Sequence, residues 1–421
     1  MSRSLRDVPP QAGPLLELLP GALDGSGPAL RVLDAASRAA ADEAPDEVVD
    51  ALPGDAALVV GTSGSTGRPR AAVLTAPALT ASARATERRL AGPGRWLMAL
   101  PLDHVAGLQV LVRSLLAGTE PVALPPGPFT ARAFAAGAAA LGAAGPRYTS
   151  LVPTQLARVL DDAAATAAAR TFDAILLGGA AAPAPLLERA HAAGLHVVTT
   201  YGMTETCGGC VYDGVPLDGV DVAVAADGRV LLAGPVLCAG YLGEDGSVED
   251  PFVDVDGVRH LRTGDLGRVT DGVLTVLGRA DDVVVTGGVN VAPAAVEAAL
   301  VTLPGVAQAC VVGVPDDEWG QAVAAVVVPA HAPPPDLAQV RAHVTALLGA
   351  PHAPRHLVVV DALPLRGPGK PDRAAARALV LARHPVHVPP TTAVHVPPTT
   401  AENVPPTTAE NVPPTTPGSR P

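Results

Sequence analysis

Ala57-Leu-Val-Val-Gly61-Thr-Ser-Gly-Ser-Thr-Gly-Arg-Pro-Arg70 is an apolar run followed by a loop rich in glycine and hydroxyl side chains. The apolar run is typical of a buried strand, and the pattern over Ala76–Leu90 is typical of a helix. Glycines give the loop unusual backbone freedom, and its N–H groups and hydroxyls can surround phosphate oxygens. The loop therefore predicts a phosphate-binding site, and the alternative is a flexible surface turn. It is not a P-loop, because the Gly-Lys-Ser/Thr ending is absent.

The pattern around this loop indicates an α/β fold. From about residue 57 to residue 200, short apolar runs alternate with helical patterns, which is typical of a mostly parallel sheet with helices on both faces. Residues 210–280 carry short Val-rich strands between Gly and Asp turns, which predicts a small antiparallel β-subdomain. An α+β pattern follows. We expect an N-terminal lobe over 1–280 and a separate, smaller C-terminal lobe over 281–384.

The last residues, 385–421, have a different composition. They contain four copies of an eight-residue period, beginning with Val388-Pro-Pro-Thr-Thr-Ala-Val-His. Pro-Pro-Thr-Thr favours polyproline II and offers little apolar surface for folding. We therefore expect a disordered repeat tail that lies outside the fold.

Composition limits the functions that the chain can have. The 421 residues carry a net charge of −12 without a basic stripe, which argues against nucleic-acid binding. No stretch of about 18 apolar residues could span a bilayer, and the N-terminus lacks the apolar region of a secretory signal. Four cysteines are too few for a disulfide framework and fit reduced thiols. These features predict a cytoplasmic protein that does not insert into a membrane.

The basic residues are very unevenly divided. Of the 29 Lys and Arg residues, 28 are arginine, and Lys370 is the one lysine. This bias indicates that arginine has replaced lysine wherever it could serve. Lys370 is therefore a candidate for chemistry that needs a lysine, and the alternative is a chance surface lysine.

Five further motifs follow the phosphate loop in order, and together they make it specific. They are Leu177-Gly-Gly-Ala-Ala181, Tyr201-Gly-Met-Thr-Glu205, Arg262-Thr-Gly-Asp-Leu-Gly267, Gly278-Arg-Ala-Asp-Asp282, and Pro364-Leu-Arg-Gly-Pro-Gly-Lys370-Pro-Asp-Arg373. From about 57 to 380 the chain resembles the acyl-adenylate-forming enzymes, which include acyl- and aryl-CoA ligases, peptide-synthetase adenylation domains and luciferases.

The resemblance implies an ATP site. It implies that the loop hydroxyls hold the ATP phosphates and that Asp265 accepts the ribose hydroxyls, with Arg279 nearby. Gly179 and Tyr201 would flank the adenine, and an aromatic face suits a purine. Taken alone, Asp265 could cap a turn and Tyr201 could belong to the core. The loop hydroxyls that would hold the ATP phosphates belong to Thr62, Ser63, Ser65 and Thr66.

The resemblance also implies the catalytic residues. Lys370 would be a mobile lysine that reaches the attacking carboxylate and the α-phosphate, where positive charge is needed in the transition state. An ammonium enters a narrow site as a point charge, whereas a guanidinium is wider. Thr204 would lie close to the α-phosphate, and Glu205 would help to hold Mg²⁺, which prefers oxygen ligands. Alone, Glu205 could be a surface charge. His104 completes this catalytic set.

A hinge and a CoA loop are implied as well. Asp281 would be the hinge about which the small lobe rotates after adenylation, presenting the Gly287-Gly288 loop to CoA. The chain departs from the family twice. Val289 stands where the family usually has Glu, and Arg70 stands where lysine is usual.

The substrate acid is indicated by Pro101-Leu-Asp-His104-Val-Ala-Gly107-Leu-Gln-Val-Leu-Val-Arg113. His104 starts a helix, and Arg113, about two and a half turns later, is predicted to lie close to the same face. A buried arginine among aliphatic side chains needs an anion. With the short chain and Tyr201-Gly-Met-Thr-Glu-Thr-Cys207, this stretch resembles 2-succinylbenzoate–CoA ligases of menaquinone biosynthesis, whose substrate has two carboxylates. Arg113 would hold the second one; the alternative is a solvent-facing arginine.

We therefore expect an ATP- and Mg²⁺-dependent acid–thiol ligase with CoA as co-substrate and a small carboxylic acid, favouring 2-succinylbenzoate. The alternatives are another aryl- or acyl-CoA ligase, a stand-alone adenylation enzyme that uses a carrier-protein thiol, or a non-catalytic nucleotide-binding relative whose Pro-rich tail binds partners. The sequence leaves the oligomeric state open, a homodimer included.

Overall fold

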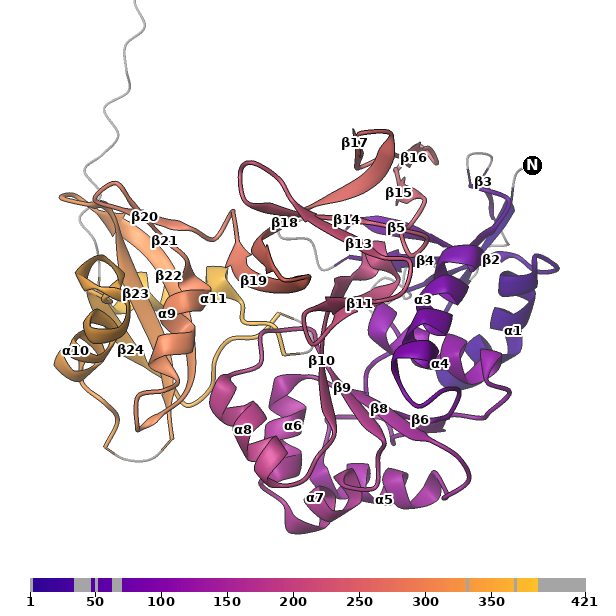
Figure 1. The fold of residues 1–421 in the computed structure, drawn as a ribbon, viewed down its shortest axis with the longest axis horizontal. Helices are drawn as coiled ribbons and strands as arrows, with labels where there is room; N and C mark the ends of the chain where they lie inside the picture. Colours follow the sequence, from indigo (N-terminus) through magenta and orange to yellow (C-terminus); the bar gives the residue numbers. More distant parts are fainter. Residues whose placement is uncertain are drawn as a thin grey trace, which may run out of the picture. The chain divides into compact units, whose positions relative to one another are not determined.

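A computed structural model of the chain describes residues 3–33, 47–49, 52–62, 70–330, 333–366 and 369–384, with the backbone alone at 47–49 (Figure 1). All of them fall within one compact unit, Met1–Val386. The predicted tail, 385–421, lies outside the described residues.

The first of two large sheets surrounds the predicted phosphate loop. Its strands run in the order β16-β15-β5-β4-β2-β1-β3, with β1, β2 and β4 parallel and β5 antiparallel to β4. The phosphate loop therefore joins two antiparallel strands, whereas the sequence placed it directly before a helix. The apolar Ala71–Thr75 forms the extra strand, and Thr75 then caps the helix. The strands are β1 (Arg3–Val8), β2 (Ala29–Val32), β3 (Glu47–Val49), β4 (Ala56–Gly61), β5 (Ala71–Thr75), β15 (Gly240–Leu242) and β16 (Val248–Glu249).

The second large sheet contains most of the mostly parallel sheet that the sequence predicted over 57–200, but the strand expected at Ala57–Gly61 belongs to the first sheet instead. The order of the second sheet is β12-β11-β10-β9-β8-β6-β7, and the strands from β10 to β7 are parallel. Their carboxyl ends therefore share one edge, which is where ligands bind in such sheets. The strands are β6 (Arg95–Met98), β7 (Val122–Ala123), β8 (Arg147–Leu151), β9 (Ala174–Leu177), β10 (Val197–Met203), β11 (Gly208–Tyr212) and β12 (Val215–Pro216).

Helices cover both faces of this sheet, as Figure 1 shows. One group shares a core with both large sheets and so lies between them: α1 (Ala12–Asp24), α3 (Ala76–Arg89) and α4 (Val105–Leu116). The other group packs on the opposite face: α5 (Ala131–Ala140), α6 (Pro153–Leu160), α7 (Ala163–Ala169) and α8 (Ala184–Ala192). Leu, Val and Ala dominate these cores, as the composition indicated.

A smaller antiparallel sheet corresponds to part of the predicted β-subdomain. The sequence assigned all of 210–280 to it, but β11 and β12 extend the second large sheet, while β15 and β16 extend the first. These pairings depend on distant strands, which local sequence does not specify. The small sheet contains β13 (Asp221–Val224), β14 (Arg229–Ala233), β17 (Phe252–Val255), β18 (Val258–Thr270) and β19 (Val273–Arg279).

The remaining residues form the predicted α+β pattern. A five-stranded sheet has α9 (Pro293–Leu300) and α10 (Leu337–Leu348) on one face and α11 (Arg373–Arg383) on the other. A separate lobe over 281–384 stays a prediction. The strands are β20 (Val284–Thr286), β21 (Val289–Val291), β22 (Val306–Asp316), β23 (Gly320–Pro329) and β24 (His356–Val359).

Candidate active site

Tyr201 lies near the carboxyl end of β10, at the ligand-binding edge of the second large sheet. Its phenol donates a 2.8 Å hydrogen bond to Oδ2 of Asp265 on β18. Burial, followed by the charge of Asp265, raises the pKa of Tyr201 well above its usual value, so the phenol remains a donor. Two residues that the sequence assigned to one nucleotide site therefore touch.

Gly179 lies in the turn after β9, the parallel neighbour of β10, and has φ +81°. This left-handed backbone suits glycine. At the preceding Gly178 an added Cβ would lie 2.4 Å from Oγ1 of Thr200, the residue before Tyr201. The turn therefore packs closely against the strand that carries Tyr201.

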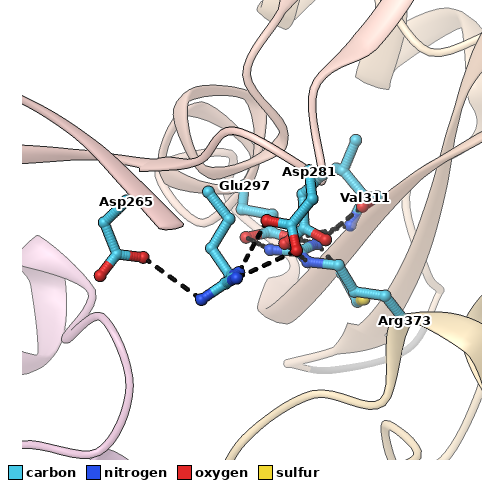
Figure 2. A network of polar contacts seen from close by, with 8 residues as sticks. Asp265, Asp281, Glu297, Val311 and Arg373 are labelled. Atoms are coloured by element: carbon cyan, nitrogen blue, oxygen red, sulfur yellow. Dashed lines mark hydrogen bonds and ion pairs between the residues drawn. The ribbon is translucent and has the colours of Figure 1, made fainter. Parts of the chain in front are cut away.

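Arg279 pairs with two carboxylates, those of Asp265 and Asp281, both of which are labelled in Figure 2. Arg279 on β19 is the cross-strand partner of Asp265 on β18, and its Nη1 lies 3.7 Å from Oδ1 of Asp265. Its Nε and Nη2 donate to the carboxylate of Asp281 at 2.9 and 3.0 Å. Burial alone would raise the pKa of Asp281, but the hydrogen bonds and charge of Arg279 outweigh it and lower that pKa. The predicted hinge residue is thus linked, through Arg279, to the predicted ribose ligand.

Glycine at position 264 makes this arrangement sterically feasible. A Cβ there would lie 2.4 Å from Nη2 of Arg279, so the guanidinium lies directly across the backbone of Gly264.

The two ends of the phosphate loop are held together. The backbone N–H of Thr62 donates to the carbonyl of Arg70 at 2.7 Å, and the N–H of Arg70 donates to Oγ1 of Thr62 at 3.2 Å. The other three predicted phosphate ligands, Ser63, Ser65 and Thr66, lie outside the described residues.

Glu205 sits with Thr204 in a short 3₁₀ turn, Thr204–Thr206, directly after β10. Its Oε1 accepts a 2.5 Å hydrogen bond from the phenol of Tyr241, on β15. Nη2 of Arg70 in turn donates to the Tyr241 oxygen at 3.1 Å. The sequence did not identify Tyr241; the available signal was that it is one of four tyrosines in the chain.

Lys370 lies directly before Pro371, which forms a bridge with Leu365, and the carbonyl of Lys370 accepts the N–H of Arg366 at 2.7 Å. The side chain is exposed, yet partial desolvation lowers its pKa; the carboxylates of Glu205 and Asp265 oppose that shift, and Arg279 adds to it. This segment packs against the start of α6, because a Cβ on Gly369 would lie 3.1 Å from Val152. The structure thus brings Lys370 within electrostatic range of the nucleotide residues.

Arg373, three residues after Lys370, joins several segments (Figure 2). Its Nε pairs with Oδ2 of Asp282 at 2.8 Å, and its Nη2 pairs with Oε2 of Glu297 at 3.1 Å. Its Nη1 donates to the carbonyl of Val311 at 2.7 Å. Asp282, the residue after the predicted hinge, is therefore paired with the first residue of α11, the helix that follows Lys370.

Replacing Arg373 by leucine should lower the free energy of unfolding by about 2–4 kcal/mol, because two largely buried carboxylates lose their cation. Urea unfolding followed by tryptophan fluorescence measures this. Arg383→Leu is the matched control on the same helix, since Arg383 is exposed and donates to a backbone carbonyl, that of Val359, at 3.0 Å. Equal losses in both variants would contradict a special role for the Arg373 cluster.

Gly287 and Gly288 form the two-residue turn between β20 and β21, with φ +54° and +77°. Such positive φ values at both turn positions favour glycine. A Cβ on Gly287 would lie 2.3 Å from the ring of Trp319, which is 37% exposed. Among the described residues, no hydrogen bond or ion pair joins this turn to Tyr201 or Glu205.

His104 and Arg113 lie at opposite ends of α4. His104 is the N-cap residue, with Nε2 at 3.8 Å from Oδ1 of Asp103, and Arg113 is in the last turn. Nine residues place them about 13 Å apart along the axis and about half a turn apart around it. The prediction that they share a face was therefore wrong.

Arg113 itself is buried, being only 4% exposed, so the alternative of a solvent-facing arginine is also wrong. Its Nη2 is 3.4 Å from the phenol of Tyr212, and its Cζ is 5.0 Å from the centre of the Trp96 ring. Within the part of the chain that the structure describes, Arg113 forms no ion pair. Three buried polar atoms on α4 also have no partner there: Oε1 of Gln109, Nε of Arg113 and Oγ of Ser114.

Comparisons with known proteins identify the family of this chain. Residues 20–241 match the AMP-binding enzyme family, and residues 295–370 match the AMP-binding enzyme C-terminal domain. The chain belongs to the AMP-binding enzyme family, which confirms the predicted superfamily.

Particular relatives are more informative still. The chain is 50% identical, over 86% of its length and 94% of the other, to a probable 2-succinylbenzoate–CoA ligase from Mycobacterium tuberculosis. It is 33% identical, over 65% of its length and 60% of the other, to a 2-succinylbenzoate–CoA ligase from Bacillus cereus.

Solved structures show the same fold. The o-succinylbenzoate CoA synthetase of Bacillus subtilis, in complex with its acyl-adenylate intermediate, superposes with a TM-score of 0.69 at 26% identity, covering 89% of this chain and 87% of that one. ATP-bound MatB from Rhodopseudomonas palustris also gives 0.69, at 27% identity over 84% and 75% of the two chains. The predicted α/β fold class is confirmed.

Proposed function

We propose that this chain is an ATP-dependent 2-succinylbenzoate–CoA ligase of menaquinone biosynthesis. A carboxylate oxygen attacks the α-phosphorus of ATP, which gives acyl-AMP and releases pyrophosphate. The CoA thiol then attacks the acyl carbon, and AMP and a proton leave. The observation that carries this proposal is the contact of both Tyr201 and Arg279 with the carboxylate of Asp265, in a family whose members bind AMP.

The nucleotide has a pre-formed set of ligands in this proposal. Asp265 receives the ribose hydroxyls, and Tyr201 with Gly179 flanks the adenine. Because Tyr201 and Arg279 both contact the carboxylate of Asp265, it is fixed before the nucleotide arrives. The phosphates lie against the loop hydroxyls, of which Thr62 is tied to Arg70.

The residues present fit a magnesium ion. Mg²⁺ in nucleotide enzymes is held by one or two carboxylates together with substrate phosphates and water. Glu205, next to Thr204 and oriented by Tyr241, supplies one such carboxylate, so a larger protein cluster is not required. When bound, the ion would neutralise charge on the phosphates.

The two half-reactions need two positions of the C-terminal residues. We place the division at 280/281, with Asp281 as hinge and Gly287-Gly288 as the CoA loop. In this proposal Lys370 acts during adenylation, and the charges of Glu205 and Asp265 already influence its pKa. Rotation about Asp281 must either carry Arg279 along or break its paired hydrogen bonds.

The acid is selected by Arg113 in this proposal. A buried guanidinium without an anion is costly, and three unpartnered polar atoms lie on the same helix. A second carboxylate on the substrate would satisfy Arg113, while the first is activated near Lys370. A monocarboxylic acid would leave the guanidinium unpaired. His104, half-buried at the start of α4, is proposed on the substrate side.

The test is pyrophosphate release against 2-succinylbenzoate, benzoate, succinate and a fatty acid, with and without CoA. We expect 2-succinylbenzoate to be fastest, and AMP with thioester to form only with CoA. A faster monoacid would indicate another acyl-CoA ligase. Acyl transfer to a carrier-protein thiol but not to CoA would indicate a stand-alone adenylation enzyme, and no pyrophosphate with any acid would indicate a non-catalytic relative.

We also propose a cytoplasmic location and a homodimer. The described cysteines are all free thiols, which fits a reducing compartment. No described helix has the length and apolar character needed to cross a membrane. Light scattering during gel filtration would test the dimer directly.

A further inference from the structure

Tyr241 links two parts of the chain that the sequence treats as separate. Its side chain is 3% exposed. The Arg70 guanidinium lies over its ring, with Cζ 3.8 Å from the ring centre, and donates to its oxygen. The same oxygen donates to Glu205. One phenol thus contacts both the end of the phosphate loop and the carboxylate assigned to magnesium.

The backbone holds this phenol in place. Tyr241 is the middle residue of β15 and pairs with Ala72 of β5, two residues after Arg70. The backbone of Glu205 is held close to the same segment, because its main-chain carbonyl accepts a 2.8 Å hydrogen bond from the N–H of Cys238, three residues before Tyr241. A small displacement of Arg70 would therefore be transmitted to Glu205 through the side chain of Tyr241.

The direction of the hydrogen bonds is fixed by chemistry. A guanidinium can only donate, and a carboxylate accepts, so the phenol receives from Arg70 and donates to Glu205. An arginine and a carboxylate this close would otherwise form a direct pair. The phenol keeps them apart, which leaves the cation able to meet a phosphate and the anion able to meet a metal ion.

We propose that Tyr241 is a positioning residue that holds Arg70 and Glu205 apart and oriented, so that ATP and Mg²⁺ bind together. This inference rests on the proposed function, since it takes Glu205 as the magnesium ligand. Tyr241 itself touches neither substrate nor metal in this role.

The test is calorimetric binding of ATP to the full chain over a series of Mg²⁺ concentrations. Tyr241→Phe keeps the ring under Arg70 but removes the hydroxyl. It should raise the Mg²⁺ concentration for half-maximal ATP binding by about 10-fold or more, the scale for losing a partner of a metal ligand. ATP binding without Mg²⁺ should change little. Tyr241→Leu, which also removes the ring, should weaken ATP binding in both conditions.

Tyr148→Phe is the matched control. Tyr148 is equally buried, and its hydroxyl donates to the carbonyl of Gly92 at 2.9 Å. An unchanged Mg²⁺ dependence in Tyr241→Phe, or an equal shift in both variants, would overturn the inference and leave the proposed function standing. Wild-type protein that binds no ATP at any Mg²⁺ concentration would overturn both.

Discussion

Lys370→Ala slows pyrophosphate release by roughly 10²–10³-fold, the scale of losing one group that stabilises charge in a transition state. The reason is that adenylation brings a carboxylate and a triphosphate together, and Lys370 supplies a positive charge that is within electrostatic influence of Glu205 and Asp265. Thioester formation from supplied acyl-AMP should survive, because in the proposed mechanism that step follows withdrawal of the lysine. The measurement is rapid-quench kinetics of each half-reaction separately.

Two variants sharpen the comparison. Arg377→Ala removes the same charge from an exposed position of α11 and should leave adenylation unchanged. Lys370→Arg keeps the charge but changes its shape, and it should recover only part of the rate, since a guanidinium is wider than an ammonium. If Lys370→Ala slowed both half-reactions equally, the assigned role would be wrong.

The pH profile gives an independent check on Lys370. Partial desolvation lowers its pKa below that of free lysine, although Glu205 and Asp265 work against the shift. The ammonium is the active form, so adenylation should decline as the pH rises through this lowered pKa. That alkaline decline should disappear in Lys370→Ala.

Much of the candidate site could be predicted because its residues lie in short motifs with a clear chemical meaning. Tyr201 and Asp265 are an example: the sequence assigned both to one nucleotide, and the structure joins them at 2.8 Å. Gly179 and Tyr201 also meet at one edge, because parallel neighbouring strands end there. Local pattern and strand direction were sufficient in these cases.

What the sequence missed depends on long-range packing. Tyr241 meets Arg70 across 171 positions, and it does so because β15 pairs with β5 instead of joining the small antiparallel sheet. No local pattern specifies that pairing. The prediction that Arg113 shares a face with His104 was wrong for a simpler reason. Nine residues turn a helix by about two and a half turns, and the extra half turn places the two side chains on opposite faces. The burial of Arg113, which the motif did indicate, was confirmed.

Arg113→Leu should reduce kcat/KM for 2-succinylbenzoate by about 10²-fold or more, the loss expected when one partner of a buried charge pair is removed. Benzoate and other monoacids should lose little, because they have no second carboxylate. The measurement is pyrophosphate release with matched mono- and diacids. An equal decrease in kcat/KM for monoacids and diacids would contradict the proposal that Arg113 binds the second carboxylate.

Stability separates this role from a structural one. Arg113 is buried beside Trp96 and Tyr212, with Nε lacking a partner among the described residues. Replacing an uncompensated buried charge by an apolar side chain is often neutral or stabilising. Ligand-free Arg113→Leu should therefore unfold at the same urea concentration as wild type, or at a higher one, even while the diacid is lost as a substrate. A structural arginine would give the opposite result, with lower stability and a similar loss for every acid. The ligand-free protein would then be less stable because the charge of Arg113 is buried without an anion. Binding of the diacid would offset this cost, and so Arg113 would favour substrates that have a second carboxylate.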